Sequence, residues 1–203
     1  MYSFEAVRIA QPFLQGEYKN ILKSIQLFPE DYKTFVVVGC GPAVYFKLSH
    51  EKNLKYIGIE PEIESFKNEI KVILENKKLG ATFLKKKLEN LKEVHLKKLT
   101  PPKIIVFVFN IANYISDFKN QLKKIVNPRD LIIISSWSRD NSSVAVREKY
   151  FGYLNNLLGK KDLIDCRLKI DLKKIDLTNF PYTFKSTLLK KEANSCLVLK
   201  MIG

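Results

Sequence analysis

The most constraining feature of the chain is a pair of apolar segments separated by a glycine turn. The segment Phe35–Val38 leads into the turn Gly39–Pro42, and a second apolar segment, Tyr56–Ile59, ends at the acid Glu60. This order predicts a strand, a tight turn, a crossover and a second strand parallel to the first. Glycine lets the backbone of such a turn approach a ligand, and an acid 19 residues after Gly41 can accept hydrogen bonds from two ribose hydroxyls. The pattern predicts a nucleoside-binding site, although an ordinary strand-to-helix turn can share these glycines.

Length and composition place the chain among single-domain α/β proteins. Its 203 residues, 46% of them hydrophobic and 28% charged, are enough to bury a full core. No apolar segment approaches the roughly 20 residues of a membrane span, and the N-terminal sequence has no basic segment followed by an apolar block. We therefore expect a cytoplasmic protein without membrane contact, with a main domain at residues 34–203 and a helical lid segment at residues 1–33.

Cysteine and histidine are sparse and scattered. They match no metal-ligand spacing and are Cys40, Cys166, Cys196, His50 and His95. We therefore expect no metal site, and a reducing compartment in which the cysteines stay free.

The net charge of +14 raises the question of a nucleic-acid partner. The basic residues are 30 lysines and 5 arginines, and the lysines are spread along the chain in short clusters. Recognition of phosphates and bases favours the planar fork of arginine, usually concentrated beside a cleft. We therefore predict a small-molecule acceptor, with nucleic acid as the less favoured partner, and leave the oligomeric state open.

Hydrophobic periodicity predicts alternating helices and strands. Helices are expected over residues 14–27, 43–50, 62–79 (closed by Gly80), 117–126 and 144–158. Strands are expected over Thr34–Val38, Tyr56–Ile59, Ala81–Leu84, Lys103–Phe109, Leu131–Ser135, Phe184–Lys191 and Cys196–Met201.

The last two expected strands are joined by Glu192–Ser195 alone, so they must pair antiparallel. The predicted fold class is α/β: a doubly wound, Rossmann-like, seven-stranded, mostly parallel sheet with a C-terminal antiparallel hairpin. A dinucleotide-binding domain usually has no such hairpin and begins its glycine turn nearer the N-terminus.

The ordered elements resemble those of class I S-adenosylmethionine-dependent methyltransferases. Val38–Ala43 is similar to the family's first motif, the glycine turn under the methionine part of the cofactor, and Ile57–Pro61 is similar to its second, with the acid on the ribose. Phe83–Leu91 lies where the family has its adenine-side loop. Val108–Asp117 resembles the fourth motif, and Leu122–Ile134 resembles the helix, proline turn and strand that follow.

This resemblance implies S-adenosyl-L-methionine as the cofactor. The cofactor-binding residues that it implies are Gly39, Cys40, Gly41, Pro42, Glu60, Pro61, Leu88, Glu89 and Asn110. In this layout Asn110 faces the methyl-transfer cleft, and Asn110 and Tyr114 are the expected catalytic residues. Capping of the loop is the alternative role of Asn110. Further candidates for the acceptor pocket are Ser135, Ser136 and Trp137, the last with a packing role as the stronger alternative. Four N-terminal aromatic residues can form a lid over this pocket, with packing in the core as the alternative: Tyr2, Phe4, Phe13 and Tyr18.

Two departures from the family keep other functions open. The family often has an acid two residues before the first glycine and another that accepts the adenine amino group; the matching positions are Val37 and Lys87, with Glu89 as a substitute for the latter. A non-catalytic binding module with this fold and an RNA methyltransferase are therefore alternatives. The chain also resembles, more weakly, nicotianamine synthases, which transfer the aminocarboxypropyl group of the same cofactor to an amine.

Overall fold

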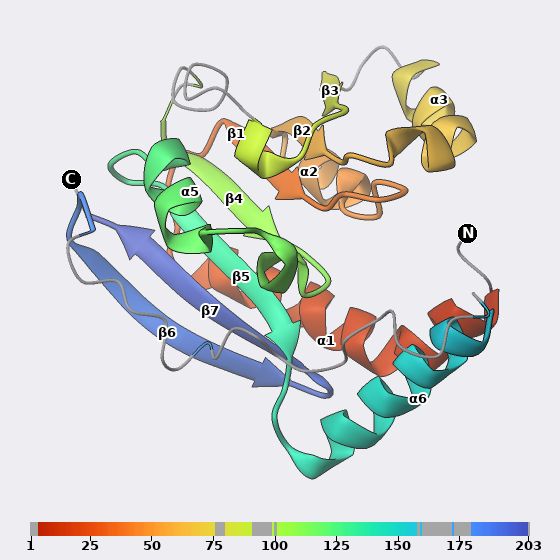
Figure 1. The fold of residues 1–203 in the computed structure, drawn as a ribbon. Coiled ribbons are helices and arrows are strands. Elements are labelled where there is room, and N and C mark those ends of the chain that lie inside the picture. The colour runs from red at the N-terminus through yellow and green to blue at the C-terminus, as the bar shows by residue number, and fades with distance from the viewer. Residues whose placement is uncertain are drawn as a thin grey trace.

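A computed structural model describes residues 4–75, 80–90, 99, 101–157, 159, 172 and 180–202 of the chain. The described residues build a seven-stranded sheet with the strand order β3-β2-β1-β4-β5-β7-β6 (Figure 1). The strands are β1 (Thr34–Val38), β2 (Lys55–Ile59), β3 (Ala81–Leu84), β4 (Lys103–Phe107), β5 (Leu131–Trp137), β6 (Phe184–Lys191) and β7 (Asn194–Met201).

Strand direction in the sheet confirms the predicted fold class. Strands β3, β2, β1, β4 and β5 pair parallel, β7 pairs antiparallel with β5, and β6 pairs antiparallel with β7. Six strands therefore run the same way and β7 runs opposite to them. Every residue of β1, β4 and β5 is buried, as expected for parallel strands covered on both faces.

Helices cover both faces of the sheet (Figure 1). They are α1 (Phe4–Leu27), α2 (Phe46–Glu51), α3 (Lys67–Glu75), α5 (Phe118–Ile125) and α6 (Asn141–Leu157), with short 3-10 helices η1 (Ile63–Phe66), η3 (Leu88–Asn90) and η4 (Ile111–Tyr114). Helix α5 packs through Leu122 on one face, and α1 and α2 pack through Ile21 and Leu48 on the other. A third cluster joins α1 to α6 around Trp137. None of the helices in the described part of the chain is both long and apolar enough to cross a membrane.

The N-terminal helix is longer than the predicted 14–27. It begins at Phe4 and continues through Pro12, which lacks the N–H that would bond to the preceding turn. Its first half is held by tertiary packing: Phe13 is fully buried, with its ring centroid 4.3 Å from that of Trp137. Core packing thus accounts for Phe13, one of the proposed lid aromatics. Tyr18 is partly exposed and stacks on Tyr45, and nothing is described of Tyr2 or of the Phe4 side chain.

Three expected strand boundaries were wrong by two residues each, and the helix expected from residue 144 begins at Asn141. The strand expected to reach Phe109 ends at Phe107, because Phe109 and Asn110 have φ values of 47° and 64°, which a strand cannot accommodate. Strand β5 continues past Ser135 to Trp137, because its last residues pair with β7. The hairpin turn consists of Glu192 and Ala193 alone, shorter than predicted, because β7 begins two residues earlier than its apolar pattern indicates.

The expected helices between β1 and β3 are shorter in the structure. The first begins at Phe46 rather than residue 43, because residues 41–45 form turns around the positive φ of Ala43. The second begins as 3-10 helix η1 and continues as α3 to Glu75, and residues 76–79 of the expected helix lie outside the described residues.

Candidate active site

The predicted glycine turn lies where the carboxyl ends of β1 and β2 meet. Gly39 and Gly41 both have positive φ, +74° and +47°, a conformation that glycine adopts without strain. The Gly39 N–H donates to the carbonyl of Ile59 at 2.9 Å, which ties the turn to the end of β2. A Cβ at Gly39 would lie 3.1 Å from a side-chain carbon of Ile111. The turn therefore leaves no room for a larger residue between itself and the loop after β4.

Glu60 is brought directly against this turn. Its Oε2 accepts a hydrogen bond from the Gly41 N–H at 3.1 Å, and its Oε1 accepts one from the Glu62 N–H, also at 3.1 Å. Each carboxylate oxygen has two lone pairs, so each can accept one further donor. Glu60 and its neighbour Pro61 are half-buried at the surface of this edge. The geometry suits a ligand with two adjacent hydroxyls.

Cys40 and Pro42 complete the turn in different ways. The Cys40 side chain is buried beneath the turn, and a Cβ at Gly58 would lie only 2.7 Å from its Sγ. Burial, together with the nearby Glu60, raises the pKa of the Cys40 thiol to about 12, so the thiol stays protonated at neutral pH. Cys40 can therefore offer its backbone to a ligand, whereas Pro42 is half-buried and lines a cavity.

The two residues that the resemblance implies for the adenine side, Leu88 and Glu89, lie on η3. Leu88 is buried in the core, and Glu89 accepts hydrogen bonds from the Ser116 N–H and hydroxyl at 3.1 and 3.3 Å, both on Oε1. No hydrogen bond within the described part of the chain reaches Oε2 of Glu89, so this atom can accept a donor. Lys87 is exposed. Of Lys87 and Glu89, only Glu89 therefore offers a hydrogen-bond acceptor at this loop.

Asn110 is a buried residue with a left-handed backbone, in the loop that follows β4. Its Oδ1 accepts hydrogen bonds from the Ser136 hydroxyl at 2.7 Å and from the Asn113 amide. It makes no side-chain cap hydrogen bond to η4. Asn110 therefore fixes the loop after β4 to the end of β5. Tyr114 lies on η4 with half of its surface exposed.

The other acceptor-pocket candidates divide between packing and hydrogen bonding. Trp137 is almost fully buried among Phe13, Tyr150 and Phe151, as its packing alternative predicts. Ser135, by contrast, donates its hydroxyl to a carboxylate from α1.

That carboxylate belongs to Glu17, a residue that the sequence analysis missed. It is only 1% exposed, and its Oε1 accepts the Phe109 N–H at 2.6 Å as well as the Ser135 hydroxyl. Its Oε2 accepts the Tyr45 hydroxyl. Desolvation raises the pKa of Glu17, and the three hydrogen bonds oppose that rise. A signal was present in the sequence: Glu17 follows Leu14 by three residues and precedes Ile21 by four, so an acid lies on the apolar face of the helix.

Glu17 faces a cavity of about 110 Å³ that α1 and α6 cover. Its walls include the glycine turn and the loop after β4, and the lining residues relevant here are Ala10, Glu17, Gly39, Cys40, Pro42 and Phe109. The cavity lies at the carboxyl ends of the parallel strands, where open α/β sheets bind their ligands.

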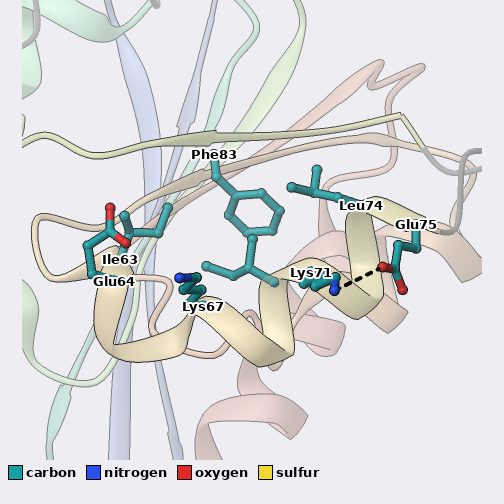
Figure 2. Close-up of a pocket in the computed structure, with 8 residues that line it drawn as sticks. Ile63, Glu64, Lys67, Lys71, Leu74, Glu75 and Phe83 are labelled. Carbon is teal, nitrogen blue, oxygen red and sulfur yellow. Dashed lines mark ion pairs between the residues drawn. The ribbon is translucent and has the colours of Figure 1, made fainter.

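A larger groove of about 530 Å³ lies between α3 and β3 (Figure 2). Figure 2 shows the Phe83 ring above α3, with Leu74 beside it and the ion pair of Lys71 and Glu75, 3.7 Å apart, at one end. None of the cofactor-binding or catalytic residues named in the sequence analysis lines this groove, although Phe83 is the first residue of the segment that resembles the adenine-side loop. The candidate site is therefore the glycine turn with its adjoining cavity.

Solved structures provide the comparison for this architecture. A protein from Methanococcus maripaludis, described as a candidate S-adenosyl-L-methionine-dependent methyltransferase, superposes with a TM-score of 0.62 at 10% identity, over 97% of this chain and 90% of its own. Magnesium protoporphyrin IX methyltransferase from Synechocystis, with bound S-adenosylhomocysteine, gives 0.60 at 11% identity, over 99% and 89%. MtNAS, a nicotianamine synthase in complex with S-adenosylmethionine, gives 0.51 at 14% identity, over 92% of this chain and 62% of its own.

These similarities define the fold of the chain as that of class I S-adenosylmethionine-dependent methyltransferases. No family model matches the sequence, and no curated protein matches it. The likeness is therefore one of structure, at identities too low to carry residue roles across.

Proposed function

We propose that this chain is an S-adenosylmethionine-dependent methyltransferase that acts on a small-molecule acceptor. The observation that carries the proposal is the junction of the glycine turn and Glu60, where the Gly41 N–H lies 3.1 Å from Oε2. A turn with two positive-φ glycines beside a carboxylate with unused lone pairs suits a ribose and the chain attached to it. The described residues thus fit the cofactor that the fold implies.

Each predicted residue has a task that its geometry allows. Gly39 and Gly41 let the backbone approach the methionine end, and Glu60 accepts the two ribose hydroxyls. Leu88 forms the apolar base of the adenine side, where Oε2 of Glu89 can accept the adenine amino group. When bound, the cofactor supplies a methyl group that its sulfonium charge activates for in-line attack.

The acceptor would lie at the ends of β4 and β5. Asn110, fixed by Ser136, holds the loop after β4 in place, and the half-exposed Tyr114 can contact an acceptor from outside. Placement and exclusion of water are then the main contributions of the protein. The excess of lysine over arginine, 30 to 5, and the spread of the lysines along the chain support a small acceptor over a polynucleotide.

Calorimetric titration of the purified protein with S-adenosylmethionine and S-adenosylhomocysteine tests the proposal. We expect binding of both, and release of S-adenosylhomocysteine when a pool of small amines, thiols and phenols is supplied. If neither nucleoside binds, the proposal is wrong and the fold serves another purpose.

Aminocarboxypropyl transfer to an amine is the second candidate. Its support is the likeness to MtNAS, together with the resemblance of the turn and the end of β5 to nicotianamine synthases. The nucleoside product separates the two reactions: methyl transfer leaves S-adenosylhomocysteine, whereas aminocarboxypropyl transfer leaves methylthioadenosine. Mass spectrometry of the spent cofactor identifies which of them forms.

A further inference from the structure

Glu17 is a buried acid without a cationic partner among the residues that the structure describes. Glutamate is rarely buried to this extent unless it is paired with a positive charge. The titratable groups that face it are Tyr45 and Cys196, and burial raises the pKa of both well above their ordinary values. Neither can supply a positive charge. The Glu17 carboxylate therefore has hydrogen-bond donors around it and no charge to balance its own.

The hydrogen bonds of Glu17 leave one acceptor position open. Oε1 accepts two donors, the Phe109 N–H and the Ser135 hydroxyl, whereas Oε2 accepts only the Tyr45 hydroxyl. A carboxylate oxygen has two lone pairs, so Oε2 can take one more donor. Of the described residues that line the adjoining cavity, Glu17 is the one with a charged side chain.

The position of Glu17 defines which end of a ligand it would meet. The same cavity is lined by Gly39, Cys40 and Pro42, the turn assigned above to the methionine end of the cofactor. That end carries an α-ammonium group. Val37, where related enzymes often have an acid, is fully buried in an apolar cluster with Tyr56 and Val106. The strand therefore provides no carboxylate here, and α1 does.

We propose that Glu17 binds the α-ammonium group of the cofactor's methionine end, so that the N-terminal helix supplies the acid missing from strand β1. This inference rests on the proposed function, because it requires the cofactor to bind at the glycine turn. The ammonium group would donate to Oε2 and place its charge beside the carboxylate, and such charge-assisted hydrogen bonds are about twice as strong as neutral ones. Glu17 would thereby select ligands that carry an ammonium group at this end.

The test compares two nucleosides that differ at this end. S-adenosylhomocysteine carries the α-ammonium group, and 5′-methylthioadenosine has the same nucleoside without it. Glu17→Gln removes the charge and keeps an oxygen for the Phe109 N–H, so the fold should persist. In calorimetric titrations we expect the variant to bind S-adenosylhomocysteine at least about tenfold more weakly and 5′-methylthioadenosine within about twofold of the wild type.

Glu5→Gln is the matched control, because Glu5 lies on the same helix, exposed and paired with Arg8. It should leave both affinities unchanged. Equal weakening of both nucleosides by Glu17→Gln would overturn the inference and make Glu17 a purely structural residue, and so would no weakening of either. If the wild type binds neither nucleoside, the proposed function itself fails, which is a distinct result.

Discussion

Each end of the sheet contains a buried carboxylate, and the two carboxylates differ in whether a cation lies beside them. At the amino ends of the strands, Asp130 is fully buried with Lys103, whose Nζ lies 2.5 Å from its Oδ2. At the carboxyl ends, Glu17 is equally buried and has no cation beside it in the described part of the chain. One carboxylate is neutralised within the protein, and the other is not.

The surroundings of Asp130 account for a structural role. Its carboxylate also accepts the backbone N–H groups of Lys103 and Asn127, at 3.0 and 2.7 Å. Both charges and the nearby donors are satisfied, so this corner joins β4 to the start of β5 and has nothing to offer a ligand. Glu17 has a cavity next to it and one unused lone pair. The comparison teaches that burial of an acid alone says little; the presence of an internal counter-charge separates a structural acid from a binding one.

Charge removal at the amino end should have the largest effect on stability. Asp130→Asn keeps an oxygen for the backbone donors and leaves Lys103 buried without a counter-charge, where burial already lowers the pKa of the amine. We expect the free energy of unfolding to fall by about 3–5 kcal/mol in urea titrations. The double variant Lys103→Met, Asp130→Asn should recover most of that loss. A loss below about 1 kcal/mol for Asp130→Asn would contradict the contrast, because a buried Lys103 without a counter-charge should cost several times that amount.

Loss of the ribose acceptor should have the next largest effect, and it should appear in binding. If Glu60 accepts the two ribose hydroxyls as proposed, Glu60→Ala removes two charge-assisted hydrogen bonds of roughly 1.5–3 kcal/mol each. We expect the affinity for S-adenosylhomocysteine to fall by at least about tenfold in calorimetry. Glu62→Ala, an exposed neighbour, is the control. Unchanged affinity in Glu60→Ala would remove this residue from the site.

A matched pair of glycine substitutions tests how closely α1 packs against the β6–β7 hairpin, because the position of Glu17 depends on this packing. At Gly16 a Cβ would lie 2.1 Å from the Lys191 carbonyl oxygen, whereas at Gly152 of α6 it would meet nothing within 4 Å. We expect Gly16→Ala to destabilise by about 1–3 kcal/mol and to weaken cofactor binding. Gly152→Ala should stabilise by about 0.5–1 kcal/mol and leave binding unchanged. If the two variants change the unfolding temperature equally, α1 does not pack closely against the β6–β7 turn.

The smallest expected effect is a change in pH dependence. The raised pKa of Glu17 means that the folded state holds its proton at pH values where the unfolded state, near the ordinary 4.5, has released it. The stability contributed by protonated Glu17 is complete below that ordinary pKa and is lost as pH rises through the folded pKa. The Glu17→Gln variant does not lose stability in this way, because the glutamine side chain does not titrate. We expect the stability of the variant relative to the wild type to increase from acidic to neutral pH in urea titrations. A relative stability that decreases instead would mean that the three donors keep Glu17 ionised in the free protein.

Local sequence patterns were sufficient to predict the part of the site that lies between β1 and the end of β2. The glycines of the turn and the acid after β2 are close in sequence to the strands that position them, so their spacing alone predicted that they meet. The structure brings Gly41 and Glu60 into hydrogen-bonding contact. Their role toward a cofactor, like that of Asn110 and Tyr114, stays a prediction.

The sequence by itself determined the alternation of strands and helices, the C-terminal hairpin and the place of the glycine turn, because each depends on residues near one another in the chain. Only the tertiary structure decided that α1 extends through Pro12 and that Glu17, on the inner face of this helix, is buried. Glu17 meets Phe109 and Ser135, which are 92 and 118 residues away. Helical periodicity can place an acid on an apolar face, but the hydrogen-bond donors that surround Glu17 come from segments far away in the sequence, and so would any cation that paired with it. Whether such an acid is structural or functional is therefore determined by packing, not by its own segment.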